Sequence, residues 1–343
     1  AISGSSLSVS GPAAGLTTIV IASIESCSNL IPGHSPFEIF LTSLCLAGVF
    51  QIILGIIKAG IIGYYFPSSV IKGMLCGIGI LLIAKEIPHF LGDDRDPQGD
   101  ESFVQIDKEN TITEILSAAA NFSPGVLLVG IVCITVIIVW QTNFIKRNKI
   151  LNAVPAPLLA VVVGILLNEA YITSNSEYAI SNPQHLVNLP VITSATAFMS
   201  KLHFPDFSAL GYYKVWEIGF LLCCVASLET LLSVEASDKL DPENKITPTN
   251  RELIAQGSGN LLCGLLGGIP ITSVIVRGSA NVTAKAKTKF STIFHGILLL
   301  IAIFIIPSLL NKIPNAALAA ILIMTGYKLT RSEEHTSELQ SHH

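Results

Sequence analysis

Residues 4–15 read Gly4-Ser5-Ser6-Leu7-Ser8-Val9-Ser10-Gly11-Pro12-Ala13-Ala14-Gly15. From Ser6 to Ser10, serines alternate with apolar residues, and this period of two predicts a short extended strand. Gly11-Pro12 then predicts the start of a helix, because proline is favoured at the first helical position. A helix that begins inside an apolar chain offers free amide N–H groups and a positive dipole end, which together suit an anion. The alternative interpretation is a polar loop at the edge of a membrane.

A second stretch with the same plan reads Gly267-Gly268-Ile269-Pro270-Ile271-Thr272-Ser273-Val274-Ile275-Val276-Arg277-Gly278-Ser279-Ala280-Asn281. Thr272–Val276 is rich in β-branched residues and predicts another strand, and a helix start follows with Arg277 at the turn. An arginine this deep in an apolar region is costly unless it faces a partner or an aqueous cavity. Its planar guanidinium suits oxyanions such as sulfate or bicarbonate. The alternative is a structural arginine that is paired permanently with a carboxylate.

The composition indicates a chain whose surface faces lipid. Of its 343 residues, 50% are hydrophobic and only 13% are charged, whereas soluble domains carry about 25% charged residues. The mean hydropathy is +0.63. The net charge is −4 and the basic residues form no stripe, so we expect no nucleic-acid partner.

Long apolar runs with short polar breaks predict about ten membrane crossings or half-crossings. Several runs are too short to span a bilayer alone, which is typical of broken helices that end at mid-membrane. The predicted segments are Pro12–Cys27, Phe37–Gly60, Pro67–Ala84, Pro124–Trp140, Val154–Asn168, Val215–Val234, Leu253–Gly268, Arg277–Ala286, Thr292–Leu310 and Ala316–Leu329.

Three basic clusters fall on the same side of the membrane when the predicted segments are counted, and the positive-inside rule makes that side cytoplasmic. These clusters are Lys146, Arg147 and Lys149; Lys239, Lys245 and Arg251; and Lys285, Lys287 and Lys289. The acidic loop Gly92–Glu101 falls on the opposite side.

Glu229 lies well inside the Val215–Val234 segment, too deep to reach the interface easily. A buried carboxylate has a raised pKa or takes a cation as its partner, as proton or sodium coupling requires. Ser233 follows one helical turn later on the same face and offers a second ligand, so Na⁺ at these two residues is possible. The alternative is a salt bridge between Glu229 and Arg277 with no transport role.

The sequence carries no Walker-type GxxxxGK[ST], no HExxH and no GxSxG motif, so ATP-driven pumping and hydrolysis lack support. An enzyme working inside the membrane would need a second catalytic group near Glu229, and we identify none. We therefore expect a protein that is not an enzyme and that needs no cofactor and no resident metal.

The chain resembles the SulP (sulfate permease) family of inorganic anion transporters. The stretches that carry the resemblance are Gly4-Ser5-Ser6 with Gly11-Pro12-Ala13, Phe66-Pro67 with Val70-Ile71-Lys72-Gly73, Ser227-Leu228-Glu229-Thr230-Leu231-Leu232, Asn250-Arg251-Glu252-Leu253-Ile254-Ala255-Gln256-Gly257, Gly267-Gly268-Ile269-Pro270, Arg277 with Asn281, and Ile313-Pro314-Asn315-Ala316-Ala317-Leu318-Ala319.

The resemblance implies an all-α integral membrane protein with a uracil-permease-like fold. That fold is a seven-plus-seven inverted repeat with core and gate subdomains, in which two short strands precede two half-helices. On this mapping residues 1–330 form the transporter domain from the end of segment two into segment twelve, incomplete at both ends. Residues 331–343 resemble the translation of a common sequencing adapter, and we expect them to lie outside the domain. The resemblance also implies a homodimer.

Carried over by position, the resemblance places the anion between the two half-helix N-termini. The predicted anion-binding residues are Ser10, Gly11, Pro12, Ala13, Val276, Arg277, Gly278 and Ser279. Glu229 matches a position that couples protons in some members, and Glu229 with Ser233 matches the sodium position of bicarbonate-importing members. One departure is Lys285, which stands where a glycine is usual and leaves the local helix packing open.

We therefore expect secondary active transport of sulfate, bicarbonate or a similar small inorganic anion across the cell membrane, coupled to H⁺ or Na⁺. The alternatives on the same fold are a dicarboxylate or nucleobase carrier, of which Arg277 disfavours the neutral nucleobase, and an anion channel, exchanger or motor.

Overall fold

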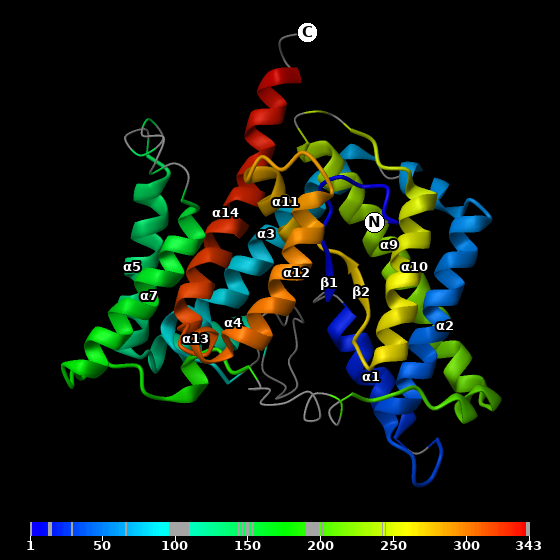
Figure 1. Ribbon diagram of the computed structural model, residues 1–343. Coiled ribbons are helices and arrows are strands. Elements are labelled where there is room, and N and C mark those ends of the chain that lie inside the picture. The colour runs from blue at the N-terminus through cyan, green and yellow to red at the C-terminus, as the bar shows by residue number, and fades with distance from the viewer. Residues whose placement is uncertain are drawn as a thin grey trace. The chain divides into compact units, whose positions relative to one another are not determined.

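The computed structural model describes residues 2–12, 16–28, 30–65, 67–95, 110–142, 145, 147, 151, 154–189, 199, 202–241, 243 and 245–340. Helices dominate it, with one antiparallel pair of short strands (Figure 1). The elements are β1 (Ser10–Pro12), α1 (Thr17–Cys27), α2 (Pro36–Ile56), η2 (Ala59–Tyr65), α3 (Ser68–Leu91), α4 (Thr111–Ala120), α5 (Pro124–Trp140), α7 (Ala156–Thr173), η4 (Pro183–His185), η5 (Phe207–Gly211), α9 (Tyr213–Leu240), α10 (Thr249–Leu266), β2 (Ile271–Ser273), α11 (Ile275–Thr283), α12 (Phe290–Ile305), α13 (Pro307–Leu310) and α14 (Asn315–Gln340).

The chain divides into two compact units, each built from two separate stretches of sequence. Unit 1 is Ala1–Gly73 with Ile192–Leu298, and unit 2 is Met74–Val191 with Leu299–His343. This division agrees with the core and gate subdomains that the resemblance predicts. Both strands of the sheet belong to unit 1.

Unit 1 is held by close packing of α2 against α10. A Cβ added at Gly48 would lie 2.7 Å from the carbonyl oxygen of Gly257, and one added at Gly257 would lie 2.7 Å from that of Gly48. Small residues that let two backbones approach this closely are typical of helix contacts in membranes. An apolar cluster packs between α2 and α9, and its members Ile39, Phe40 and Leu222 are fully buried.

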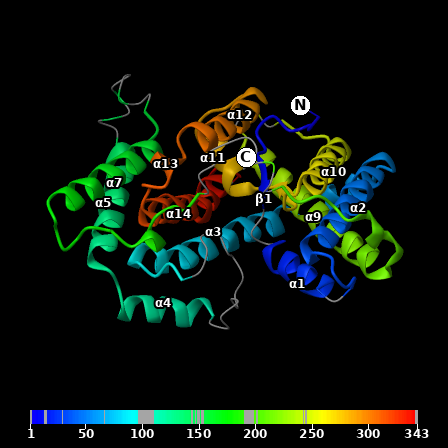
Figure 2. The same ribbon diagram turned by 60° about the horizontal axis from the view of Figure 1, so that its bottom comes forward.

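In unit 2, α5, α7 and α14 pack around a second apolar cluster that includes Val129, Cys133 and Ala317. Helices α5 and α7 lie side by side in both views (Figures 1 and 2). Helix α4 is bent by 111° from α5 (Figure 2). Helices α3 and α14 approach each other as closely as α2 and α10 do, since a Cβ added at Gly79 would lie 2.7 Å from the carbonyl oxygen of Gly326.

Four described helices are long and apolar enough to cross a membrane, namely α2, α3 from Lys72 onward, α7 and α9. The bent pair α4–α5 would make a fifth if it is one span. Helix α12 is shorter and apolar, and none of its residues is buried. An apolar helix with no buried side chain is suited to contact with lipid.

Each predicted apolar segment overlaps with a helix, and Thr292–Leu310 is divided between α12 and α13. The predicted start of the first helix is wrong. Gly11 and Pro12 end strand β1, where they pair with Thr272 and Ile271, and α1 begins only at Thr17. A proline lacks an amide donor but fits a short edge strand. The predicted strand Thr272–Val276 is also too late, because β2 ends at Ser273 and Val276 lies in α11.

Helix α4 was not predicted, because its ten residues form no long apolar run. Its local signal is an N-terminal capping box, in which Asn110 accepts hydrogen bonds from the Ile112 and Thr113 amides. Such a box is a sequence signature of a helix start. At the other end of the chain, α14 continues to Gln340, beyond the predicted end at Leu329.

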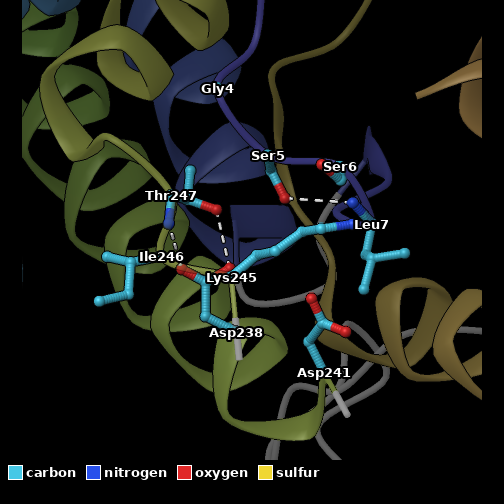
Figure 3. Close-up of a pocket in the computed structure, with 9 residues that line it drawn as sticks. All are labelled: Gly4, Ser5, Ser6, Leu7, Asp238, Asp241, Lys245, Ile246 and Thr247. Atoms are coloured by element: carbon cyan, nitrogen blue, oxygen red, sulfur yellow. Dashed lines mark hydrogen bonds between the residues drawn. The ribbon is translucent and has the colours of Figure 1, made fainter. Parts of the chain in front are cut away.

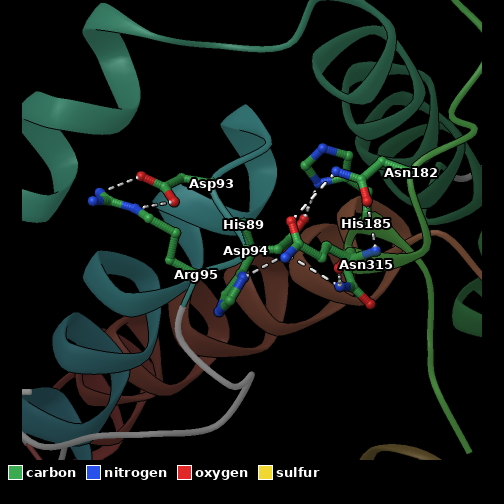
Figure 4. Close-up of polar contacts among 8 residues, drawn as sticks. His89, Asp93, Asp94, Arg95, Asn182, His185 and Asn315 are labelled. Carbon is green, nitrogen blue, oxygen red and sulfur yellow. Dashed lines mark hydrogen bonds and ion pairs between the residues drawn. The ribbon is translucent and has the colours of Figure 1, made fainter. Parts of the chain in front are cut away.

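Asp94 joins three segments of unit 2 (Figure 4). Its carboxylate is only 2% exposed and lies 2.7 Å from the Nδ1 atoms of both His89 and His185. Asn315, at the start of α14, donates a third hydrogen bond of 3.1 Å. Burial by itself would raise the pKa of Asp94, but the hydrogen bonds from His185, His89 and Asn315 outweigh burial and hold this pKa below its ordinary value.

We predict that Asp94→Asn lowers the stability of the protein by about 2 kcal/mol at pH 7, because hydrogen bonds to a buried charge are the strong ones. Thermal unfolding should show a melting temperature lower by a few degrees. The carboxylate's contribution is complete above the unfolded pKa of about 3.9 and is lost only as the pH falls through the lower folded-state pKa. Asp94 itself therefore stays ionised at both pH 6 and pH 8.

Asp93→Asn is the matched control. Asp93 pairs with Arg95, whose side chain is 52% exposed, and an exposed pair contributes only about 0–1 kcal/mol. Equal destabilisation by the two substitutions would contradict the role assigned to Asp94.

Helix α11 ends in a Schellman motif with a lysine where glycine is preferred. The Ala286 amide donates to the Asn281 carbonyl at 3.1 Å, and the Lys285 amide donates to the Val282 carbonyl at 2.8 Å. Lys285 has a φ of 59°, which is the left-handed conformation that glycine adopts without a Cβ penalty. Lys285, which stands where the family usually has a glycine, therefore leaves the hydrogen bonds of this helix end in place. Its left-handed backbone conformation carries some strain.

We predict that Lys285→Gly raises the free energy of unfolding by about 0.5–1 kcal/mol, because it removes the Cβ from a left-handed residue. The measurement is thermal unfolding of the purified protein. Lys285→Ala removes the same charge but keeps the Cβ, so it should give no such gain. A larger gain from alanine than from glycine would show that charge and not backbone conformation limits this helix end.

Candidate functional site

The two strands of unit 1 bring the two predicted helix starts together. Strands β1 and β2 are antiparallel, with Ser10 opposite Ser273, Gly11 opposite Thr272 and Pro12 opposite Ile271 (Figure 1). The pairing extends to Val9, whose carbonyl accepts the Val274 amide at 3.0 Å. The hydroxyls of Ser8 and Ser273 lie 2.5 Å apart. The start of α11 therefore lies beside the beginning of β1.

Arg277 reaches across this junction to Gly11. A Cβ built at Gly11 would lie 2.9 Å from the guanidinium carbon of Arg277 and closer still to Nη1. With the guanidinium in this position, a side chain at residue 11 would displace it. Arg277 is exposed, and no hydrogen bond or ion pair of its side chain is present within the described residues. A positive charge is thus presented at the strand junction.

The free amides of α11 lie slightly earlier than the sequence predicts. The Gly278 amide donates to the Val274 carbonyl at 2.9 Å inside the helix, so Gly278 and Ser279 offer no free N–H group. Val274 is the N-cap, and the first three helical amides have no partner within their own helix. The available donors are therefore those of Ile275, Val276 and Arg277.

The remaining predicted anion-binding residues lie around the same junction. Ser10 and Pro12 are exposed on β1 and Gly11 between them is buried. Ala13 lies outside the described residues. Gly278 is buried, and a Cβ there would lie 2.8 Å from the hydroxyl oxygen of Ser237.

The two predicted cation residues lie on α9 beside the strands. Glu229 is half-buried and interacts with its surroundings, and Ser233 is 5% exposed one turn later. Thr230, next to Glu229, accepts a hydrogen bond from the Ser273 amide at 3.4 Å. The α9 segment that carries Glu229 is therefore in direct contact with β2.

Three polar residues of α10 that sequence reasoning left without a role also contact this junction. Glu252, Gln256 and Asn260 are 0%, 2% and 1% exposed. Their spacing of four residues along α10 is the signal that would have shown a shared face. Their partners are residues of, or next to, the two strands.

A separate pocket of about 250 Å³ lies where the chain approaches β1 (Figure 3). Asp238 and Asp241 line it together with Lys245 and the 4–7 segment. Asp238 accepts hydrogen bonds from the amide and the hydroxyl of Thr247 at 2.6 and 2.7 Å. Its carboxylate thereby fixes the loop between α9 and α10, and two carboxylates in the lining disfavour an anion in this pocket.

The family model for the sulfate permease family matches residues 1–341. Similar relatives include the putative sulfate transporter YvdB of Bacillus subtilis, 24% identical over 96% of this chain and 61% of that protein. The bicarbonate transporter BicA of Picosynechococcus sp. is 29% identical over 92% of this chain and 51% of that protein. The chain thus spans between half and two thirds of these relatives.

Solved structures show the same fold. The transmembrane domain of a cyanobacterium bicarbonate transporter BicA aligns with a TM-score of 0.61 at 23% identity, covering 95% of this chain and 76% of that one. Murine Slc26a9 in the inward-facing state aligns with a TM-score of 0.62 at 15% identity, covering 97% and 55%. With its membrane-spanning helices and this match over almost its whole length, the chain is an integral membrane protein of the sulfate permease family.

Proposed function

We propose that this chain is the transporter domain, over residues 1–330, of a carrier for a small inorganic anion of the sulfate or bicarbonate class. The observation that carries the proposal is the Arg277 guanidinium at Gly11 of β1. Free amides at the start of α11 and a guanidinium form a donor-only site, which matches an oxyanion that only accepts hydrogen bonds from its host. Of the two relatives described above, one is named a bicarbonate transporter and the other a putative sulfate transporter.

In the proposed mechanism the anion binds between β1 and the first turn of α11. Residues 10–13 and 276–279 surround it, with Arg277 as the charged partner. Glu229 and Ser233 on α9 bind the driving H⁺ or Na⁺, close enough to β2 for the two sites to affect each other through Thr230. Movement of one subdomain against the other then gives alternating access. Assembly as a homodimer stays a prediction.

A dicarboxylate carrier or an anion channel or exchanger is the second candidate. A donor-only site also suits an organic dicarboxylate, and competition of dicarboxylates with sulfate uptake would favour that carrier. Anion flux that depends on neither a proton nor a sodium gradient would favour the channel or exchanger.

We predict that Arg277→Ala in the full-length protein weakens binding of sulfate or bicarbonate by roughly tenfold to a hundredfold. The basis is that a hydrogen bond to a charged group contributes about 1.5–3 kcal/mol. The measurement is uptake of the radiolabelled anions into vesicles as a function of anion concentration. Lys239→Ala is the control, because Lys239 is a partly exposed cation paired with Glu235 at 3.5 Å, and its affinity should not change. Unchanged affinity in Arg277→Ala would refute the site.

We predict that Glu229→Gln makes anion uptake independent of the cation gradient, because glutamine keeps the shape of the side chain but binds neither a proton nor a sodium ion. Anion affinity measured without a gradient should change only a few-fold. The test imposes pH and sodium gradients separately on vesicles. Glu235→Gln, on the same helix and paired with Lys239, should retain the dependence of the unmodified protein. Retained dependence in Glu229→Gln would remove Glu229 from the coupling.

A further inference from the structure

One face of α10 carries three fully buried polar side chains, Glu252, Gln256 and Asn260, which we call the α10 ladder. Residues four apart lie above one another on a helix, so the three side chains form a single column. Burying such groups is unfavourable unless each finds a hydrogen-bond partner. An apolar column would pack at no such cost. The partners of the ladder therefore indicate what it does.

Each member of the ladder binds a different part of the strand junction. Glu252 accepts hydrogen bonds from the Ser3 hydroxyl at 2.6 Å and the Gly4 amide at 3.1 Å, in the segment that leads to β1. Gln256 donates to the hydroxyl oxygen of Ser10, the first residue of β1, at 2.6 Å. Asn260 accepts the amide of the first residue of β2, Ile271, at 2.7 Å. One helix face thus holds both strands.

The ladder is itself fixed from α2 and α9. Asn260 donates to Gln51 of α2 at 2.7 Å, and Gln51 donates to Ser227 of α9 at 3.2 Å. Gln51 is fully buried, and the backbones of α2 and α10 touch at Gly48 and Gly257. The ladder is therefore bonded to α2 beside the close backbone contact of α2 and α10.

The strand pair needs such support. It has three residues on each side, and an isolated two-stranded pair is at best marginally stable. The Arg277–Gly11 contact exists only while the two strands keep their register, because Arg277 follows β2 by four residues and Gly11 is the middle of β1. Hydrogen bonds weaken steeply when their distance and angle deteriorate.

We propose that Gln256 and Asn260 are positioning residues for the anion site: through Ser10 and the Ile271 amide they set the register of β1 and β2 that places Arg277 against Gly11. This inference rests on the proposed function. The residues do not touch the anion. They determine its affinity by fixing where the donors lie.

The test is Gln256→Met in the full-length protein, with sulfate and bicarbonate affinity measured in vesicles. Methionine has the same length, removes the donor to Ser10, and also removes an acceptor oxygen of Gln256 that is buried without a partner in the described part of the chain. We expect the apparent KM to rise about tenfold, the equivalent of one hydrogen bond, with the maximal rate changed less. Gln256→Asn, one methylene shorter, is the second variant if methionine prevents folding, and it should act in the same direction.

Ser258→Ala is the matched control. Ser258 lies on the same helix, but its hydroxyl donates to the Ile254 carbonyl within α10 at 2.7 Å. Its KM should equal that of the unmodified protein. Thermal unfolding of each variant separates loss of fold from loss of affinity.

A double-mutant cycle with Arg277→Ala tests positioning directly. If Gln256 acts by placing Arg277, its substitution should cost much less affinity once Arg277 is absent. Additive losses, or an unchanged KM in folded Gln256→Met, would overturn the positioning role. If the unmodified protein binds neither anion, the proposed function fails first. If it binds them and Arg277→Ala loses them while Gln256→Met does not, only the positioning inference fails.

Discussion

The hydrogen-bonded contact between β1 and β2 is the constraint on which unit 1 depends. Extended backbone inside an apolar protein leaves amide and carbonyl groups that lipid cannot satisfy. Here the backbone groups of each short strand form hydrogen bonds with those of the other strand. The Val274 amide, which donates to the Val9 carbonyl, extends this pairing by one residue. Because the two strands come from the two separate stretches of sequence that form unit 1, their pairing also joins these stretches to each other.

A two-stranded pair of this length is not stable by itself. The hydrogen bonds that α10 makes to the two strands explain why this helix carries polar residues inside a membrane protein. Helix α10 does not qualify as a span by hydropathy, although its eighteen residues are as many as those of α7. Its column of Glu252, Gln256 and Asn260 faces the strands and not lipid. The polar residues of α10 lower its hydropathy, but they also provide hydrogen-bond partners for the extended backbone of β1 and β2 inside the protein.

The apolar runs are enough to predict the long helices, because lipid contact and length leave little choice for a run such as Pro36–Ile56. They were not enough to predict the strand boundaries. Proline at position 12 fits both the first turn of a helix and the end of an edge strand, and only its pairing with Ile271 decides. Helix α4 was missed because its signal is the cap at Asn110 and not hydrophobicity.

For the candidate site, the sequence shows the residue types but not their geometry. Arg277 and Gly11 each stood out in their own motif, yet their contact depends on the antiparallel register, which no local pattern contains. The register also explains their asymmetry. A second arginine at position 11 of β1 would place like charges side by side, whereas Gly11 leaves the space that the Arg277 guanidinium occupies. A charge held there is costly for a membrane protein unless water or an anion meets it. The absence of a side chain at Gly11 and the charge of Arg277 are therefore the two features that the antiparallel register combines at this junction.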